Sequence, residues 1–395
     1  MDETILQFGT GKFLRCFLDL FAEELNQGAR PAGKIVAVQS TGTERARQIN
    51  RQHGRFHAAI RGLEAGQVVD RTCQVTSVRR ALAAAEDWDQ ILQAARSESL
   101  VAIVSNTTEA GLALAPAEAP PGGPPESFPA KLLAVLLARF EAGGDGLTIL
   151  PCELVERNAD QLLDLVLEQA ARWPVRGDRV EWIRHECVWR NTLVDRIVSA
   201  PRADDPLAAE DPLLAVAEPF ALWLIEGDAT EAGGATSASG LPVAAHPAVE
   251  FVEQLEPYHL RKVRILNGAH TALVAKALPL GIETVREALD DARIRPWLES
   301  LLFEEIVPAI ADRAEGAEAF ARRTLERLAN PFLDHRLADI ALHHDTKLST
   351  RLRPTLEEYR ARFGRSPRIL AEILGRPKGA VPVNDCLNTP RRSGA

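Results

Sequence analysis

Short apolar runs alternate with helical stretches through the first part of the chain, and this alternation constrains the fold more than any other feature. The runs have the length of buried strands: "TILQF" (4–8), "KIVAVQS" (34–40), "SLVAIVS" (99–105) and "LTILPCEL" (147–154). Stretches such as "ADQLLDLVLEQAARW" (159–173) repeat apolar residues at helical spacing. Because strands that alternate with helices form a mainly parallel sheet, the sequence predicts an N-terminal Rossmann-type, doubly wound α/β domain.

The pattern changes beyond this region. From residue 191 to about 240 the sequence is rich in strand-like runs, and "EGDATEAGGATSASGLP" (226–242) has the composition of a loop. Beyond it helical spacing predominates, beginning with predicted helices around 247–256 and 260–280. We therefore expect two domains, a dinucleotide-binding Rossmann-type domain over 1–245 and a mainly α-helical substrate and catalytic domain over 246–395.

Composition excludes several classes of protein. The 395-residue chain has a formal net charge of −9, which argues against nucleic-acid binding because phosphate contacts need a basic surface. No apolar run reaches the roughly 18 residues that a membrane-spanning helix needs, so no membrane contact is expected. The five cysteines are widely spaced and form no CxxC pair, which favours reduced thiols in a cytoplasmic protein. His185 with Cys187 lacks further ligands at suitable spacing, and so does the pair His343–His344, so no metal site is predicted.

A glycine loop follows the first predicted strand. In "ILQFGTGKFLRC" (5–16), Gly9 and Gly11 lie between that strand and a helix. Bare backbone lets a pyrophosphate approach, and the helix N-terminus offers N–H groups and positive potential. Leu14 occupies the place of the usual third glycine, and a tight turn without a ligand is the alternative. We predict a dinucleotide site that includes Phe8, Gly9, Thr10 and Gly11.

The ends of two further strands bear on the cofactor. An acidic residue at the end of the second strand usually binds the ribose 2′-hydroxyl of NAD, but here Gln39 and Ser40 occupy that place. NAD is the predicted cofactor, and the sequence leaves NADP open. "VSNTTEAG" (104–111) ends another strand with small polar residues suited to a ribose, or equally to an ordinary helix N-cap with a capping box. The cofactor contacts predicted here come from Ser105, Asn106, Thr107 and Glu109.

The stretch "KVRILNGAHTALVAKAL" (262–278) places Lys262, Asn267 and His270 in an otherwise apolar helix. At about 100° per residue, Asn267 lies about 140° from Lys262 and His270 about 80° from it, so the three share one side of the helix. An amine can serve as general acid or base if burial lowers its pKa. The amide and the imidazole can donate hydrogen bonds to an oxygen that becomes negative. These three residues are the predicted catalytic set, and a solvated helix face without chemistry is the alternative.

This stretch also resembles the Lys-x4-Asn-x2-His signature of the polyol-specific long-chain dehydrogenases, the mannitol dehydrogenase family. The resemblance covers most of the chain and implies a metal-independent dehydrogenase with Lys262, Asn267 and His270 as its catalytic residues. "FGTGKFLR" (8–15) resembles the family's cofactor loop, which implies cofactor contacts from Phe13 and Arg15.

Other segments resemble the family's substrate side. "NTLVDRI" (191–197) implies a substrate contact from Asp195, and "NPFLDHRLADIALHHDTK" (330–347) implies one from Lys347. The asparagine that the mannitol branch carries is replaced by Leu154, and Asn158 is the candidate to take its place at the substrate.

Within the family, "SNTTEAG", "CELVERNAD", "ILNGAHTALV" and "IETVREALDD" resemble the tagaturonate reductases, or altronate oxidoreductases. The resemblance implies hydride transfer between NAD(H) and a small-molecule keto sugar acid, tagaturonate, to give altronate, with Lys262 as general acid or base and no metal. A carboxylate substrate needs a cation, and Lys347, Arg264 and His335 are the candidates.

Two alternatives remain open at the level of sequence. A neutral-polyol dehydrogenase of the mannitol or arabinitol type, or a fructuronate reductase, would use the same residues on another substrate. A non-catalytic dinucleotide-binding regulator would need the glycine loop but not the Lys262, Asn267 and His270 set.

Overall fold

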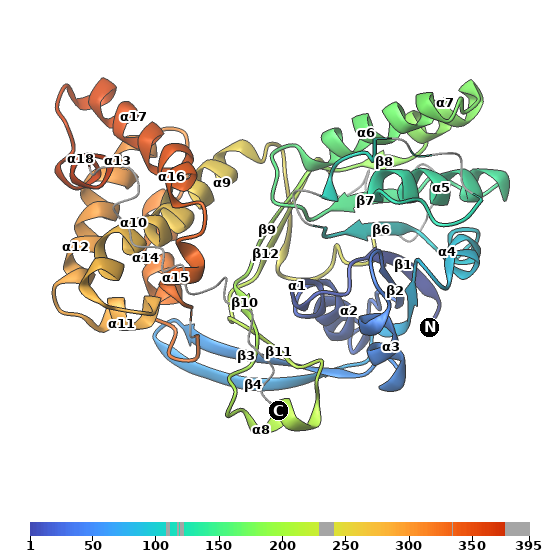
Figure 1. Ribbon diagram of the computed structural model, residues 1–395, viewed down its shortest axis with the longest axis horizontal. Coiled ribbons are helices and arrows are strands. Elements are labelled where there is room, and N and C mark those ends of the chain that lie inside the picture. Colours follow the sequence, from blue (N-terminus) through green and yellow to red (C-terminus); the bar gives the residue numbers. More distant parts are fainter. Residues whose placement is uncertain (108–110, 117, 119–121, 229–240, 334, 376–395) are drawn as a thin grey trace, which may run out of the picture. The chain divides into compact units, whose positions relative to one another are not determined.

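The computed structural model describes residues 1–107, 111–116, 118, 122–228, 241–333 and 335–375. The chain divides into two compact units (Figure 1). The first comprises Met1–Arg61 and Val69–Leu255, and the second comprises Gly62–Val68 and the chain from Glu256 onward.

The first unit is built on a parallel sheet. In the described residues its six strands are, in spatial order, β5 (Val78–Ala83), β2 (Lys34–Gln39), β1 (Glu3–Phe8), β6 (Ala102–Ser105), β7 (Thr148–Pro151) and β8 (Val188–Trp189). All neighbouring pairs are parallel. This order is that of a Rossmann sheet, and the chain switches from one half of the sheet to the other between β1 and β6. The predicted doubly wound fold is confirmed.

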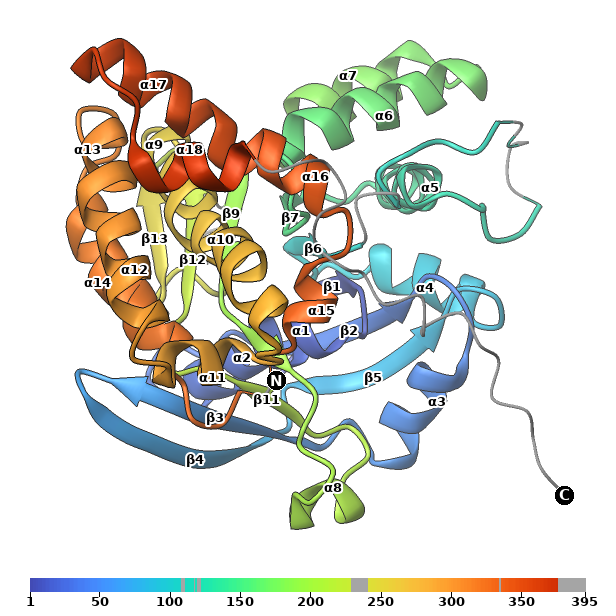
Figure 2. The same cartoon turned by 60° about the vertical axis from the view of Figure 1, so that its left-hand side comes forward.

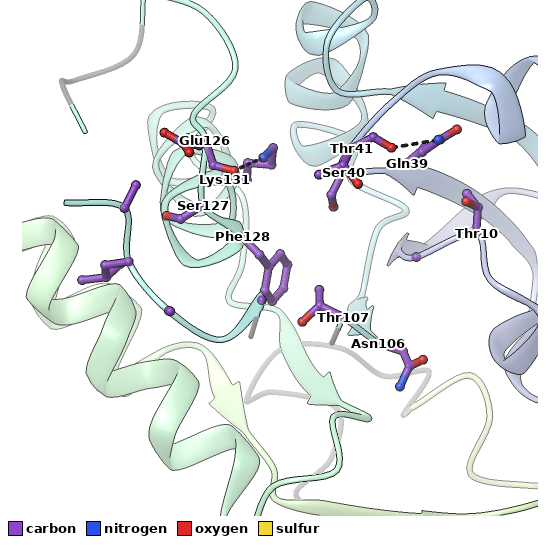
Figure 3. Close-up of a pocket in the computed structure, with 15 residues that line it drawn as sticks. Thr10, Gln39, Ser40, Thr41, Asn106, Thr107, Glu126, Ser127, Phe128 and Lys131 are labelled. Carbon is purple, nitrogen blue, oxygen red and sulfur yellow. Dashed lines mark hydrogen bonds between the residues drawn. The ribbon is translucent and has the colours of Figure 1, made fainter. Parts of the chain in front are cut away.

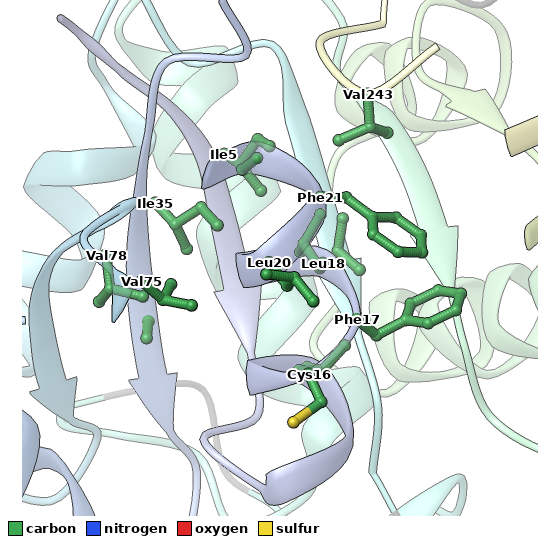
Figure 4. Close-up of a cluster of buried hydrophobic side chains, with 14 of the residues drawn as sticks. Ile5, Cys16, Phe17, Leu18, Leu20, Phe21, Ile35, Val75, Val78 and Val243 are labelled. Carbon is green, nitrogen blue, oxygen red and sulfur yellow. The ribbon is translucent and has the colours of Figure 1, made fainter. Parts of the chain in front are cut away.

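Helices cover both faces of this sheet, which explains its uniformly apolar strands. Leu6 and Phe8 of β1 pack on one face, beneath α4 (Trp88–Ala95), α5 (Phe128–Glu141), α6 (Asn158–Arg172) and α7 (Gly177–His185). Ile5 and Ile35 pack on the other face, against α1 (Lys12–Arg15), α2 (Leu18–Asn26) and α3 (Glu44–Arg51). Figure 4 shows this second cluster, with Ile5 and Ile35 on neighbouring strands. Strands buried on both faces need apolar residues at every position, rather than at alternate ones.

Smaller sheets complete the first unit. One contains β10 (Val198–Ser199), β11 (Ala215–Ala217), β3 (Phe56–Glu64) and β4 (Gln67–Val75), in that order. The other contains β13 (Val249–Val252), β12 (Leu222–Glu226) and β9 (Thr192–Asp195). A short helix, α8 (Pro206–Glu210), begins after Asp205, whose side chain accepts a hydrogen bond from the Leu207 N–H. The strand-rich pattern predicted for residues 191–240 is confirmed where the structure describes it.

The predicted helix around 247–256 is wrong, because Val249–Val252 form a strand. β13 pairs in parallel with β12, with Trp223 opposite Val249 and Glu226 opposite Val252. The backbone hydrogen bonds between β13 and β12 join β13 to the first unit. The second unit therefore begins at Glu256, whereas the sequence placed the boundary at 245. Gly62–Val68, at the turn between β3 and β4, also belongs to the second unit, where the Gly66 N–H donates to the Glu326 carboxylate at 2.6 Å.

In the described residues, the second unit is mainly helical from Glu256 to Gly375, as predicted. Its elements are α9 (Glu256–Arg261), the π-helical turn η2 (Lys262–Asn267), α10 (Gly268–Ala277), the 3-10 turn η3 (Leu278–Leu280), α11 (Val285–Asp290), α12 (Ile294–Ser300), the π-helical turn η4 (Leu301–Ile306), α13 (Val307–Ile310), α14 (Ala317–Leu328), α15 (Leu337–Ile340), α16 (His344–Lys347), the π-helical turn η5 (Leu348–Leu352), α17 (Arg353–Phe363) and α18 (Arg368–Leu374). All residues of α10 except Lys276 are buried, and the helix lies among the other helices (Figure 2). No helix in the described ranges is long and apolar enough to cross a bilayer.

Candidate active site

A cavity of about 720 Å³ lies at the carboxyl ends of β1, β2 and β6. That is the switch point of a Rossmann sheet, where such folds bind their ligands, and the volume is typical of a small-molecule site. Figure 3 shows Thr10, Ser40, Asn106 and Thr107 around this space, with Phe128 from α5 beside it. The structure thus brings together the ends of the strands that the sequence assigned to the cofactor.

The two glycines of the loop have different roles. Gly9 has φ +136°, and a Cβ there would lie 2.9 Å from Leu14 Cδ1 and 3.2 Å from the Asn106 carbonyl oxygen. Gly9 is therefore required by the fold itself. Gly11 is the N-cap residue of α1 with φ −69°, and a Cβ there would meet no protein atom within 4 Å. Gly11 is exposed and, unlike Gly9 and Thr10, does not line the cavity, so the space beside it is open.

Other residues of the loop lie inside the protein. Arg15 is 2% exposed; its Nη1 donates to the Thr10 carbonyl at 2.6 Å and its Nη2 to the Leu213 carbonyl at 3.0 Å. Burial lowers the pKa of this guanidinium. Phe8 packs on Phe128 with ring centroids 5.2 Å apart, and Phe13 packs on the following helix. These contacts make Arg15 and Phe8 supports of the loop, and none of the three side chains lines the cavity.

Glu153 hydrogen-bonds the end of β6, the second segment predicted to contact the cofactor. The sequence analysis did not identify this residue. Its carboxylate accepts from Ser105 Oγ at 3.1 Å and from the Thr107 N–H at 2.8 Å. Asn106 Nδ2 donates to the Cys152 carbonyl at 2.8 Å. Burial raises the pKa of Glu153, while these hydrogen bonds oppose that change. The end of β6 is thus fixed to the end of β7, and an acidic residue at a strand end was the available signal. Glu109 lies outside the described residues.

The end of β2 carries no carboxylate toward the cavity. Gln39 Nε2 donates to the Thr41 carbonyl at 2.8 Å and its Oε1 accepts from the Ala46 N–H at 2.7 Å, so both ends of the amide are hydrogen-bonded within the loop. The Ser40 hydroxyl is buried with no hydrogen-bond partner among the described residues. A buried hydroxyl without a partner is costly, which favours a ligand hydroxyl at this point. Lys131 of α5 also lines the cavity, with its ammonium bound to the Glu126 carbonyl at 2.6 Å.

Two substrate-side residues of the first unit are buried. Asn158 is 1% exposed; its Oδ1 accepts from the Thr192 N–H at 2.9 Å and its Nδ2 donates to the Pro151 carbonyl at 2.9 Å. Asn158 therefore joins β7 to β9 as a structural residue, and its contacts do not support the substrate role expected from the sequence. Asp195 is buried at the end of β9, opposite Leu222 of β12.

In the second unit, Lys262–Asn267 form a π-helical turn, not the α-helix that the sequence indicated. A π-helix closes i→i+5 hydrogen bonds, so residues five apart come onto the same face. Lys262 and Asn267 are five apart, and the separation of about 140° expected for an α-helix does not apply to them. Both are half-buried. π-Helical turns within longer helices occur often at functional sites.

His270 is neutral, and its ring orientation is defined. Nδ1 lies 3.0 Å from the Leu266 carbonyl, which can only accept, so Nδ1 carries the proton. Burial, then the charge of the neighbouring His335, lowers the pKa of His270 to about 3. Nε2 is then an acceptor, and it is buried without a partner among the described residues. In this geometry Nε2 offers a lone pair, whereas the sequence analysis expected a hydrogen-bond donor at His270.

The three candidate cations for a substrate carboxylate differ in their present partners. Arg264 is already paired, with Nη2 3.2 Å from the Glu358 carboxylate. Burial lowers the pKa of His335, whose ring packs edge-on against His270 with centroids 5.0 Å apart. The Lys347 ammonium donates to the Ile340 carbonyl at 2.9 Å, and burial followed by the charge of Arg351 lowers its pKa.

Among the described residues, no group of three or more His, Cys, Asp or Glu side chains is placed to hold a metal ion.

Comparison with known proteins decides the family. The family described as mannitol dehydrogenase Rossmann domain matches residues 3–236, and the mannitol dehydrogenase C-terminal domain matches residues 254–376. The chain belongs to the mannitol dehydrogenase family. It is an oxidoreductase that acts on CH–OH groups, as the sequence predicted.

Curated relatives and solved structures agree with this assignment. The altronate oxidoreductase of Bacillus subtilis (strain 168) is 36% identical over 93% of this chain and 77% of its own length. The altronate oxidoreductase of Yersinia enterocolitica is 36% identical over 94% of this chain and 78% of its own. Two solved structures share the fold. A substrate-free D-sorbitol dehydrogenase has a TM-score of 0.79 at 21% identity, covering 95% of this chain and 79% of its own. Pseudomonas fluorescens mannitol 2-dehydrogenase, in a ternary complex with NAD and D-mannitol, has a TM-score of 0.75 at 20% identity, covering 95% and 78%.

The open space beside Gly11 gives a first prediction. Gly11→Val should abolish or strongly weaken NADH binding, because its side chain would occupy the space that a pyrophosphate needs, while the fold accepts the added atoms. Calorimetric titration with NADH measures this. Gly177→Val is the matched control, since a Cβ at Gly177, at the start of α7, also meets nothing within 4 Å. Unchanged affinity in Gly11→Val would remove this loop from the cofactor site.

The neutral state of His270 gives a second prediction. Its folded-state pKa of about 3 is below its ordinary value of 6.5, so the unfolded chain binds a proton that the folded chain does not. The resulting stability is present above pH 6.5 and is lost as the pH falls toward 3, at up to about 1.4 kcal/mol per pH unit. His270→Asn should flatten the pH dependence of the free energy of unfolding between pH 7 and 5, measured in urea, and the exposed His185→Asn should not. Equal slopes in wild type and His270→Asn would contradict this account.

Proposed function

We propose that the chain transfers hydride between NAD(H) and a keto sugar acid, reducing tagaturonate to altronate or catalysing the reverse reaction, with a lysine as general acid or base and without a metal. The observation that carries the proposal is the π-helical turn that puts Lys262 and Asn267 on one face, followed by His270 with an unpartnered Nε2. The substrate is inferred from the altronate oxidoreductases at 36% identity over most of the chain. The cytoplasm remains the proposed location.

The Rossmann cavity fits a nicotinamide dinucleotide. The backbone of Gly9 to Gly11 would hold the pyrophosphate, and the unpartnered Ser40 hydroxyl would meet the adenosine ribose. Asn106 and Thr107, fixed by Glu153 and the Cys152 carbonyl, would support the nicotinamide half. The bound nicotinamide supplies or accepts the hydride. NAD is the proposed form, and NADP is to be tested beside it because β2 does not end in a carboxylate.

Proton transfer is assigned to Lys262. In reduction its ammonium donates the proton to the new alkoxide, and in oxidation its amine removes the hydroxyl proton. The Asn267 amide donates a hydrogen bond to the reacting oxygen, which stabilises negative charge there. His270 cannot do the same, because its Nε2 holds a lone pair; it accepts from a substrate hydroxyl and so orients the chain of the sugar. Asp195 and Lys347 remain proposed substrate contacts, and the next section develops the role of Lys347.

A substrate panel tests the reaction. Purified protein should oxidise NADH with tagaturonate faster than with fructuronate, and much faster than with the neutral ketose fructose. Mannitol with NAD tests the neutral-polyol alternative. Prolonged chelation should leave the rate unchanged, since the lysine needs no metal. A loss of rate that zinc restores, or a preference for mannitol and fructose, would overturn the proposal.

The role of Lys262 gives a separate prediction. Lys262→Ala should lower kcat by about 10²- to 10⁴-fold, the range typical of a lost general acid or base, and remove one limb of the pH–rate profile. NADH binding should be unaffected, because the proposed cofactor residues belong to the other unit. Lys276→Ala, on α10 of the same helical stretch, is the matched control and should change kcat less than about threefold. A change of less than about twofold in Lys262→Ala would assign this lysine to a solvated surface.

A further inference from the structure

Two cations, Lys347 and Arg351, lie on the same face of α16 and η5 as His344. With Asn267, His270 and Thr271 these three residues form what we call the polar cluster of the second unit. Along α16 and η5, Asp345, Thr346, Ser349 and Thr350 are exposed, whereas His344 is buried and Lys347 and Arg351 are half-buried. Spacings of three and four residues put side chains on one helix face. Lys347 and Arg351 therefore lie on the less exposed face of this stretch, although cations usually occupy the solvated face.

One of these cations, Arg351, is hydrogen-bonded to the helix that carries the proposed catalytic residues. Arg351 Nη1 donates to Thr271 Oγ1 at 3.3 Å, and Thr271 Oγ1 donates to the Asn267 carbonyl at 2.9 Å. The positive charge of Arg351 also lowers the pKa of His270, of His344 and of Lys347, although burial is the largest cause in each case. Arg351 is thus close to the imidazole beside Thr271 and to the ammonium of Lys347.

His344 adds an unsatisfied group at the same place. It is 7% exposed, and neither ring nitrogen has a hydrogen-bond partner among the described residues. A neutral imidazole carries one donor and one acceptor, and leaving a buried polar group unpaired is destabilising. A ligand with both hydroxyl and acceptor oxygens would satisfy it. A sugar acid has both.

We propose that Arg351 and Lys347 form the anchor for the substrate carboxylate, with His344 bound to the adjoining oxygen atoms. The inference rests on the proposed function, since it assigns the part of the keto acid that a neutral polyol lacks. A carboxylate between a guanidinium and an ammonium relieves the repulsion between the two cations, and the planar guanidinium matches its two oxygens. Through Thr271, the same anchor sets the substrate's distance from Asn267 and His270.

The test compares altronate with altritol, the polyol that has a CH₂OH group in place of the carboxylate. Binding of each is measured by calorimetry with NADH present, so that neither is oxidised. Wild type should bind altronate about 10- to 100-fold more tightly than altritol, the effect of charge-assisted hydrogen bonds worth about 1.5–3 kcal/mol. Arg351→Met and Lys347→Met should each reduce that ratio at least about fivefold and leave altritol binding within about threefold.

Further variants distinguish the loss of a carboxylate contact from misfolding or a general loss of ligand binding. Arg351→Lys retains the charge but not the planar fork, so it should keep part of the altronate preference and serves if Arg351→Met does not fold by circular dichroism. Arg353→Met removes an exposed arginine two residues further on and should leave the ratio unchanged. Equal binding of altronate and altritol by wild type, or equal losses for both ligands in Arg351→Met and Lys347→Met, would overturn the anchor. A preserved carboxylate preference with no reduction of any keto acid would instead refute the proposed reaction and leave the anchor in place.

Discussion

The π-helical turn Lys262–Asn267 is the constraint on which the proposed catalytic arrangement depends. Such a turn is rare because it is wider than an α-helical turn, and it persists only where surrounding packing supports it. Gly268 follows it directly, and a Cβ there would lie 3.3 Å from Leu352 Cδ2 and 3.8 Å from Ile306 Cδ1. Leu352 ends η5 and Ile306 ends η4, so these other π-helical turns close around a residue without a side chain. Local backbone geometry and core packing thus determine together which face Lys262 and Asn267 share.

Hydrogen bonds identify residues that support the fold, whereas an unpaired buried atom suggests a ligand contact only where a site is proposed on other grounds; both amide atoms of Gln169 in α6 are also unpaired among the described residues. Buried polar groups are nearly always paired, so an unpaired one needs an explanation. Arg15 and Asn158 are bound to backbone atoms at distances of 2.6–3.0 Å, and such residues hold the fold around the site. Ser40 Oγ, His270 Nε2 and both nitrogens of His344 have no partner in the part of the chain that the structure describes. These atoms lie at the Rossmann cavity and in the polar cluster of the helical unit, where ligands are proposed.

The sequence predicted what depends on local pattern and missed what depends on distant contacts. Apolar runs such as Lys34–Gln39 identified the parallel sheet because strands covered on both faces are apolar throughout. The glycine loop was placed correctly because φ +136° at Gly9 requires glycine. Val249–Val252 was assigned to a helix because its pairing with β12 leaves no signal in the local sequence. The hydrogen bonds of Glu153 span 46 or more residues, and the π-helical turn departs from the 3.6-residue period on which the helical assignment rested.

The lowered pKa values of the buried histidines favour a binding role for these rings and leave proton transfer to a lysine in the proposed mechanism. An imidazole works best as a proton carrier when its pKa is near the working pH. Burial together with neighbouring positive charge opposes protonation of His270, His335 and His344, and it brings the pKa of His270 to about 3. A pKa below the ordinary value favours the neutral ring near pH 7, so we propose that these imidazoles bind hydroxyl groups and do not carry the proton. The charge of Arg351 adds to burial in lowering the pKa of His270 and His344, and it would also favour an anionic substrate, which leaves Lys262 as the proposed proton-transfer group.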